Sequence, residues 1–230
     1  KMLQKFYTTK LFYNKYLYKL RVKSNLAPLF RGLNLGYVKT KLDVMQRDAE
    51  ADLPITSPFN FSMARRKEKT ISLETFMDAC VVYNALEKNK SNTMVRCEGF
   101  NLDIYSNEPD WLQGLMTQID VLQWHEPEND EIFDYLIDNA NTKIVDGKVE
   151  WEFKAFLGRN VDPNFAEYCE NNPDGFRIGK VAKRVVRNNH FAEGFYFFAK
   201  NERYLMLAKI ALGGQIRRVI KYVSQQDLHK

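Results

Sequence analysis

The segment Glu150–Lys154 contains the residues whose types and spacing come closest to catalytic chemistry. In a strand, alternate residues share one face, so Glu150, Glu152 and Lys154 would point the same way. Two carboxylates can hold Mg²⁺ while a lysine orients water, as a metal-dependent nuclease requires. These three are candidate catalytic residues. The same alternation also predicts a self-neutralising solvent face opposite apolar neighbours, and we favour that interpretation.

The triplet Glu152-Phe153-Lys154 resembles one half of the motif of restriction-like nucleases. The resemblance implies Mg²⁺-dependent cleavage. The upstream acid of that motif has no good counterpart, because Asp146 falls in a predicted turn and Asp138 at a predicted helix end.

Other sites for metals or cofactors are not predicted. The three histidines are scattered, and the acidic run Glu126–Asp138 lacks the glycine turn and ligand spacing of a Ca²⁺ loop. We find no phosphate-binding loop and no nucleophile motif. We therefore expect no cofactor and no metal. Whether the protein is an enzyme stays open, and we favour a protein that is not one.

A basic helix is the stronger binding candidate. At helical spacing, one side of the segment 177–187 gathers five cations and the other side gathers apolar residues. Such a face suits phosphates, and its cations would span about 15 Å at 1.5 Å per residue. An ordinary solvated outer face is the alternative. The five predicted phosphate contacts are Arg177, Lys180, Lys183, Arg184 and Arg187.

The C-terminal segment repeats the positive sign. Its apolar spacing over Ile216–Val223 favours a helix, with a strand as the alternative, and three cations point outward: Arg217, Arg218 and Lys221. A preceding helix from Glu202 toward Leu212 and the Gly213-Gly214 turn would also allow a helix-turn-helix, in which Gln215 and Arg218 enter a major groove. A helical hairpin made only for packing gives the same pattern.

The elements that must position these residues indicate an α+β fold, with helices packed on short antiparallel sheets. Asp146-Gly147 between two alternating runs predicts a β-hairpin. Phe195–Phe198 is predicted as a buried strand, and Ser72 and Asn201 as helix N-caps. We expect a single domain, 1–230, with a conceivable division into 1–60 and 61–230. The proline-containing stretch 52–60 would be the linker, followed by an auxiliary basic cluster, Arg65, Arg66 and Lys67.

Charge is distributed in three blocks. Residues 1–70 carry a net charge of +10, residues 71–175 carry −14 and residues 176–230 carry +9, so the total of +5 conceals two basic segments. Either could hold a polyanion if folding gathers its cations on one face. The acidic middle would then face away from the polyanion and contact a basic protein partner, or screen against nonspecific binding.

These patterns predict a non-enzymatic accessory protein that binds or helps to process nucleic acid, either DNA or RNA. The alternative is a structural protein that forms homo-oligomers through its basic ends and acidic middle; a Mg²⁺-dependent nuclease comes third. No apolar run is long enough to span a membrane. We expect a cytoplasmic protein without membrane partners. The composition, rich in Lys, Asn, Tyr and Phe, suggests that the protein comes from a phage or mobile element.

Overall fold

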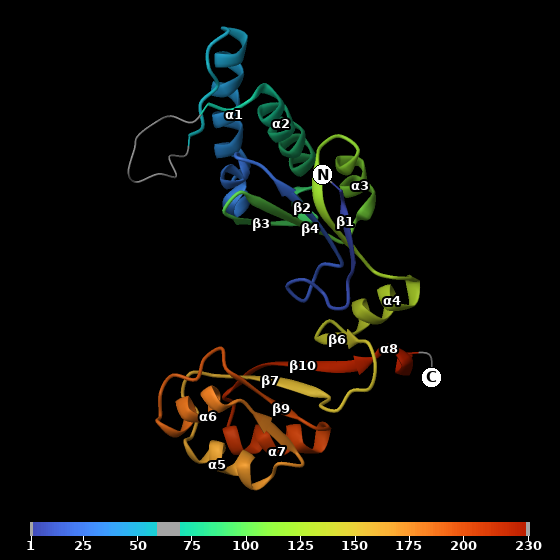
Figure 1. Ribbon diagram of the computed structural model, residues 1–230, viewed down its shortest axis with the longest axis vertical. Helices are drawn as coiled ribbons and strands as arrows, with labels where there is room; N and C mark the ends of the chain where they lie inside the picture. Colours follow the sequence, from blue (N-terminus) through green and yellow to red (C-terminus); the bar gives the residue numbers. More distant parts are fainter. Residues whose placement is uncertain (1, 59–69, 229–230) are drawn as a thin grey trace. The chain divides into compact units, whose positions relative to one another are not determined.

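The computed structural model describes residues 2–58 and 70–228, and its chain divides into two compact units (Figure 1). Unit 1 contains the N-terminal residues through Thr8 together with Phe12–Asp134. Unit 2 contains Thr9–Leu11 and the chain from Tyr135 onward. Both units combine helices with a five-stranded sheet, which confirms the α+β class. Within the described ranges, no helix is both long and apolar enough to cross a membrane.

The sheet of unit 1 has the strand order β1-β5-β2-β4-β3. β1 and β5 are parallel, and the other neighbours are antiparallel. The hairpin between β3 and β4 turns at Gly99, whose φ of 59° suits glycine. The strands are β1 (Gln4–Tyr7), β2 (Tyr18–Lys23), β3 (Thr93–Glu98), β4 (Asn101–Ser106) and β5 (Val121–Glu126).

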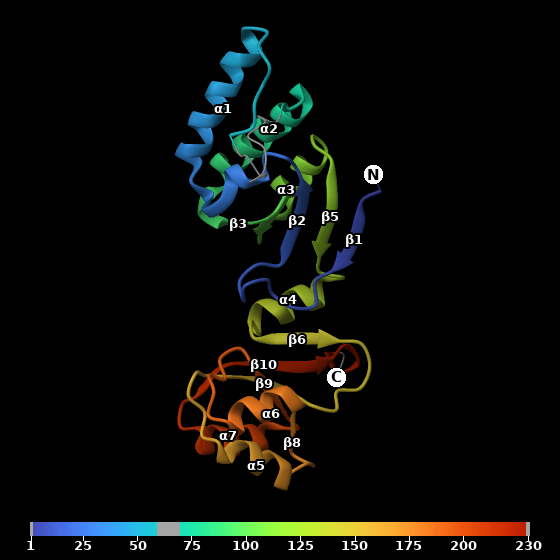
Figure 2. The same cartoon turned by 60° about the vertical axis from the view of Figure 1, so that its left-hand side comes forward.

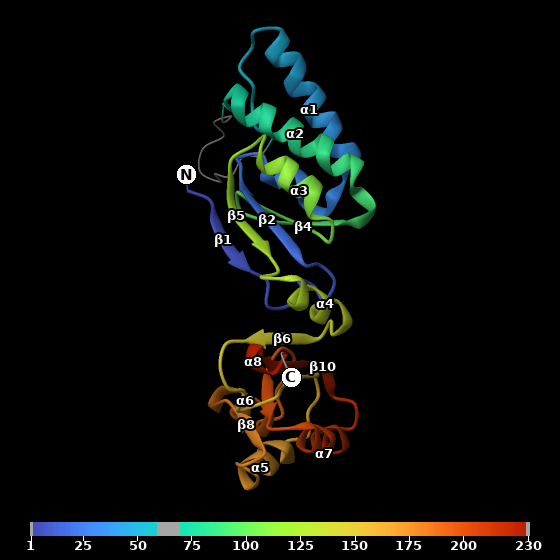
Figure 3. The ribbon, with the colours of Figure 1, turned by 90° about the vertical axis from the view of Figure 1, so that its right-hand side faces the viewer.

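Helices cover one face of this sheet (Figure 3). They are α1 (Leu35–Glu50), α2 (Leu73–Lys88) and α3 (Pro109–Met116), with 3₁₀ turns at Ala27–Leu33 and Lys90–Asn92. The predicted cap Ser72 accepts a hydrogen bond from the Thr75 amide. Leu20, Ile104 and Trp124 point from the sheet into the core beneath the helices.

The sheet of unit 2 has the order β6-β10-β7-β9-β8. β10 runs parallel to β6 and antiparallel to β7, and β9 pairs antiparallel with both β7 and β8. The strands are β6 (Thr142–Val145), β7 (Phe153–Leu157), β8 (Phe176–Ile178), β9 (Tyr196–Ala199) and β10 (Ile216–Ser224).

Three helices pack on one face of this second sheet, namely α5 (Asn164–Asn171), α6 (Lys180–Arg187) and α7 (Glu202–Leu212) (Figure 2). Their apolar residues share a core with Ala155 and Leu157 of β7 and with Phe197 and Ala199 of β9. The predicted cap Asn201 accepts from the Tyr204 amide and begins α7. A short helix, α8 (Gln225–Leu228), follows β10, and α4 (Asp130–Asp138) contains the boundary between the units.

The predicted hairpin at Asp146-Gly147 is wrong. Both flanking strands form, but β10 lies between β6 and β7, so they do not pair with each other. Gly147 does adopt the positive φ of a turn, at 81°. The chain bends at these two residues, but β10, a strand from the C-terminal part of the chain, occupies the position beside β6.

The predicted helix over Ile216–Val223 is also wrong, because this segment is the strand β10. The helix-turn-helix interpretation is therefore also wrong, because α7 and the Gly213-Gly214 turn are followed by a strand instead of a second helix. The sequence fits both the helical and the strand spacing of apolar residues, and pairing with β6 and β7 stabilises the strand.

The chain divides at a different place from the boundary considered after residue 60. Leu42 and Met45 of α1 lie in the same core as Phe76 and Val82 of α2, so residues on both sides of that point build unit 1. The division given by the contacts comes after Asp134.

Candidate nucleic-acid interface

The face of the unit 2 sheet that is opposite its helices gathers cations and aromatic rings. Because side chains alternate along a strand, burying Ala155 and Leu157 beneath the helices turns Lys154 and Phe156 to the other side. In β9, burial of Phe197 and Ala199 likewise turns Tyr196 and Phe198 outward. We call this surface the cationic face; its members on the sheet are Lys143, Lys154, Arg177, Arg218, Phe156, Tyr196, Phe198 and Tyr222. We include Lys10, from the segment Thr9–Leu11 of unit 2, because the charges of Arg218, Lys143 and Lys154 act on it.

Strand register aligns these side chains in rows across the sheet. In the first row, Arg177 is opposite Phe198, and Phe198 is opposite Lys154. In the second row, Phe156 lies between Tyr196 and Arg218. A third row pairs Lys143 with Tyr222. Residues directly opposite each other on neighbouring strands have side chains within contact distance.

The cations of the cationic face lie over its rings. The Lys154 ammonium nitrogen is 3.6 Å from the centre of the Tyr196 ring and 5.1 Å from that of Phe156. The Arg218 guanidinium carbon is 4.4 Å from the Phe156 centre. At the two sides of the sheet, Arg177 lies 6.0 Å from Phe198 and Lys143 lies 5.7 Å from Tyr222. These distances fit cation–π attraction, which holds the charges against the sheet.

The electrostatics of the cationic face are those of crowded positive charge. Burial lowers the pKa of Lys154, and the charges of Lys143 and Arg218 lower it further. The pKa of Lys10 is lowered by burial first and then by Arg218, Lys143 and Lys154. All the charges that lower the pKa values of these two lysines are cations. Such a group of like charges attracts an anion.

The predicted basic helix forms only in part. Arg177 lies in β8 rather than in α6, because the helix begins at Lys180 after its N-cap Gly179. Two of its cations are paired with Glu170 of α5: Lys183 at 2.9 Å, and Arg187. Lys180 and Arg184 are exposed. Since α6 covers the core side of the sheet, the predicted phosphate contacts belong to two different surfaces.

The other predicted contacts are also dispersed. Arg217 forms an ion pair of 2.5 Å with Glu193. Arg218 joins the cationic face, and Lys221 is exposed at a position opposite Phe153. The auxiliary cluster Arg65, Arg66 and Lys67 lies outside the described residues.

The candidate catalytic residues do not share one strand face. β7 begins at Phe153, so only Lys154 lies in a strand, while Glu150 is exposed before it. Glu152 lines a cavity of about 690 Å³ together with Lys148 and Lys221. Among residues 2–58 and 70–228, no group of three or more His, Cys, Asp or Glu could hold a metal ion.

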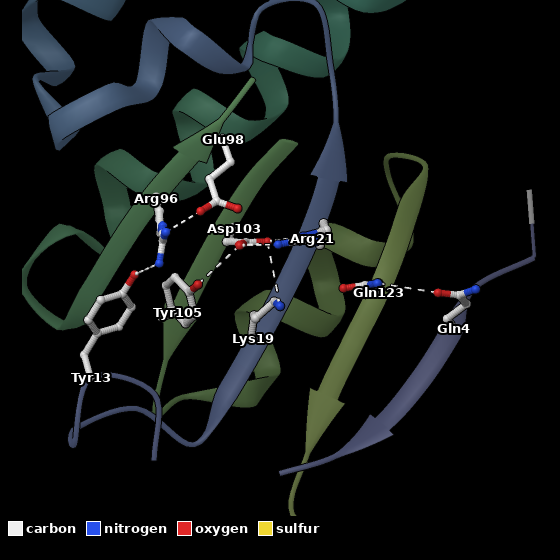
Figure 4. Close-up of polar contacts among 9 residues, drawn as sticks. All are labelled: Gln4, Tyr13, Lys19, Arg21, Arg96, Glu98, Asp103, Tyr105 and Gln123. Carbon is white, nitrogen blue, oxygen red and sulfur yellow. Dashed lines mark hydrogen bonds and ion pairs between the residues drawn. The ribbon is translucent and has the colours of Figure 1, made fainter. Parts of the chain in front are cut away.

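Unit 1 contains a second polar cluster, on the sheet face opposite its helices (Figure 4). Its centre is Asp103, only 3% exposed, whose two carboxylate oxygens accept hydrogen bonds from Arg21 at 2.5 and 2.7 Å. Lys19 lies 4.0 Å from the same carboxylate, and the Tyr105 hydroxyl donates to it at 3.3 Å. Burial raises the pKa of Tyr105, and the Asp103 charge adds to the effect.

The remaining contacts of this cluster are at its periphery. Arg96 pairs with Glu98 and donates to the Tyr13 hydroxyl at 3.3 Å, and Gln123 donates to Gln4 at 3.5 Å (Figure 4). Because each of its cations lies beside a carboxylate, with Lys19 and Arg21 sharing Asp103, this cluster differs from the cationic face. Asp103, held by a forked arginine, is poorly suited to bind a metal.

Sequence reasoning missed the aromatic members of the cationic face. It singled out Arg177, Arg218 and Lys154, each for a different reason, and treated Phe195–Phe198 as wholly buried. The alternation of side chains along a strand was the available signal. Phe156 is two residues after Lys154, and Phe198 is two residues after the exposed Tyr196, so each ring shares a strand face with that residue. The participation of Lys10 had no sequence signal, because it lies more than 130 residues before Lys143. No protein-family model, curated protein or solved structure matches the chain.

Proposed function

We propose that this protein binds nucleic acid and that the cationic face is the surface in contact with it. The observation that carries the proposal is the set of four cations that lie over rings on this sheet face, Lys143, Lys154, Arg177 and Arg218. Lys10 lies near enough that Arg218, Lys143 and Lys154 add to the effect of burial in lowering its pKa. A polyanion would relieve this repulsion on binding. The cytoplasmic location and the phage or mobile-element origin expected from composition belong to the same proposal.

The cationic face is a better candidate than the basic helix for a reason of charge balance. Glu170 neutralises part of α6 through Lys183 and Arg187, and these exposed pairs would have to be broken before phosphates could use the cations. On the cationic face, Lys154 and Arg218 contact rings, which leaves their charge available to phosphate oxygens.

A salt titration tests the proposal by comparing two charge-reversal variants. Arg177→Glu/Arg218→Glu alters the cationic face, and Lys180→Glu/Arg184→Glu alters an equal number of exposed cations on α6. Binding of labelled single- and double-stranded DNA and RNA is measured at several salt concentrations. We expect the first variant to bind at least about tenfold more weakly, and to reduce the slope of log K against log salt by about 1.4 for a single strand.

The matched variant separates this proposal from its rivals. If Lys180→Glu/Arg184→Glu causes the larger loss, the basic helix is the interface and the cationic face is not. If neither variant changes binding, or if the unaltered protein binds no polymer, the proposal is overturned. The cations would then be reassigned to acidic protein surfaces or to self-association between the basic and acidic blocks of the chain.

A further inference from the structure

The rings of the cationic face form a connected series across three strands. The Phe156 and Tyr196 ring centres are 5.8 Å apart, Tyr196 and Phe198 are 5.5 Å apart, and Phe198 and Tyr222 are 6.3 Å apart. Tyr196 is 40% exposed, so part of its ring is accessible to a ligand. Cation–π attraction accounts for each ring that lies beside a cation. A connected series of rings also offers a surface on which bases can stack.

The shape of the surface constrains the polymer. Apart from Lys10, the members of the cationic face lie on five adjacent strands, which at about 4.8 Å per strand spacing extend across roughly 19 Å. The major groove of a DNA duplex is only about 12 Å wide, so a sheet presented face-on does not enter it. In a duplex the base faces are also stacked on each other and cannot contact these rings.

We propose that the cationic face prefers single-stranded nucleic acid, whose unpaired bases stack on Tyr196 and neighbouring rings while Arg177, Lys154 and Arg218 hold the phosphates. This inference rests on the proposed function and adds the class of polymer. Stacking tolerates every base, because each has a π-face, so the preference is for unpaired strands rather than for one sequence. The Arg218 guanidinium over Phe156 offers a further flat surface for a base.

The test compares a labelled single strand of about twelve nucleotides with the duplex of the same sequence, in DNA and RNA versions. We expect the single strand to bind at least about tenfold more tightly at physiological salt. Tyr196→Leu removes the ring but keeps apolar bulk, and it should weaken single-strand binding by about five- to 100-fold while leaving duplex binding nearly unchanged. Tyr196→Phe keeps the ring and should bind as the unaltered protein does.

Tyr37→Leu is the matched control. Tyr37 is 43% exposed on α1 of unit 1 and lies beneath Lys41, so it reproduces the exposure and the cation contact of Tyr196 on another surface. Equal binding of duplex and single strand, or an equal effect of the two tyrosine variants, overturns the strand preference. If Arg177→Glu/Arg218→Glu still weakens binding by at least about tenfold in that case, the proposed function survives. If no polymer binds, both fail.

Discussion

The Lys154 ammonium nitrogen lies 3.6 Å from the centre of the Tyr196 ring, across the paired strands β7 and β9. Sequence patterns assign these residues to different roles: a lysine among the candidate catalytic residues and a tyrosine in a buried strand. The sheet brings them into contact, and cation–π attraction holds the ammonium group and the ring together. Their contributions to binding can nevertheless be separated, because one is electrostatic and the other is stacking.

Lys154→Gln should change the salt dependence of binding, whereas Tyr196→Leu should not. Losing one phosphate contact lowers the slope of log K against log salt by about 0.7 for a single strand. Losing the ring reduces affinity at every salt concentration. Fluorescence anisotropy at four or five salt concentrations measures both quantities. Lys41→Gln, which removes the lysine above Tyr37, is the control, and an equal slope change in it would contradict the assignment.

His125 should make the stability of unit 1 depend on pH. Burial, with the Lys19 charge second, lowers the pKa of His125 to about 4 from an ordinary 6.5. The unfolded chain therefore binds more protons between these values, so this contribution to stability is complete above pH 6.5 and is lost as the pH falls toward 4. After allowing for partial exposure we expect about 1–2 kcal/mol.

The measurement is denaturant unfolding at intervals from pH 4 to 7, with His125→Phe beside the unaltered protein. Phenylalanine preserves the stacked contact with Phe6, whose ring centre is 4.7 Å away, but cannot titrate. Carboxylates titrate in both proteins, so the difference between the two curves isolates the histidine. A difference that does not vary with pH would contradict the prediction.

Asp103→Asn should destabilise unit 1 strongly. The buried carboxylate is the partner of the Arg21 guanidinium, and removing its charge leaves that cation partly desolvated without compensation. We expect a loss of about 3–5 kcal/mol in the free energy of unfolding. The double variant Arg21→Met/Asp103→Leu should recover much of it. Glu98→Gln, which breaks an exposed pair with Arg96, should cost at most about 1 kcal/mol.

Gly175→Ala should destabilise unit 2 for a steric reason. A Cβ atom built at Gly175 would lie 2.1 Å from the Tyr204 Cε1 atom, and the backbone is held in place because the Gly175 carbonyl accepts from the Lys200 amide at 3.0 Å. We expect a loss of about 1–3 kcal/mol by thermal or chemical unfolding. Gly179→Ala is the control, since no heavy atom lies within 4 Å of its built Cβ. Equal losses would contradict the steric account.

Local patterns were sufficient for elements whose ends are fixed by nearby residues. α2 begins at Leu73, directly after its N-cap Ser72. α7 begins after its N-cap Asn201 and ends at Leu212, where the C-cap Gly213 adopts the left-handed conformation. These signals act within one helical turn, which is why they can be read from the chain alone. The α+β class and the basic ends followed from the same kind of local information.

Partners distant in sequence decided the rest. β10 is a strand because β6 and β7 pair with it on both sides, although its sequence also fits a helix. That insertion separated β6 from β7 and brought Arg218 and Tyr222 beside Phe156 and Lys143. Helix packing on one side of the sheet then determined which residues of β7 and β9 face outward. Composition gave this protein its positive charge, but strand order, a property of the whole fold, placed that charge among aromatic rings on one surface.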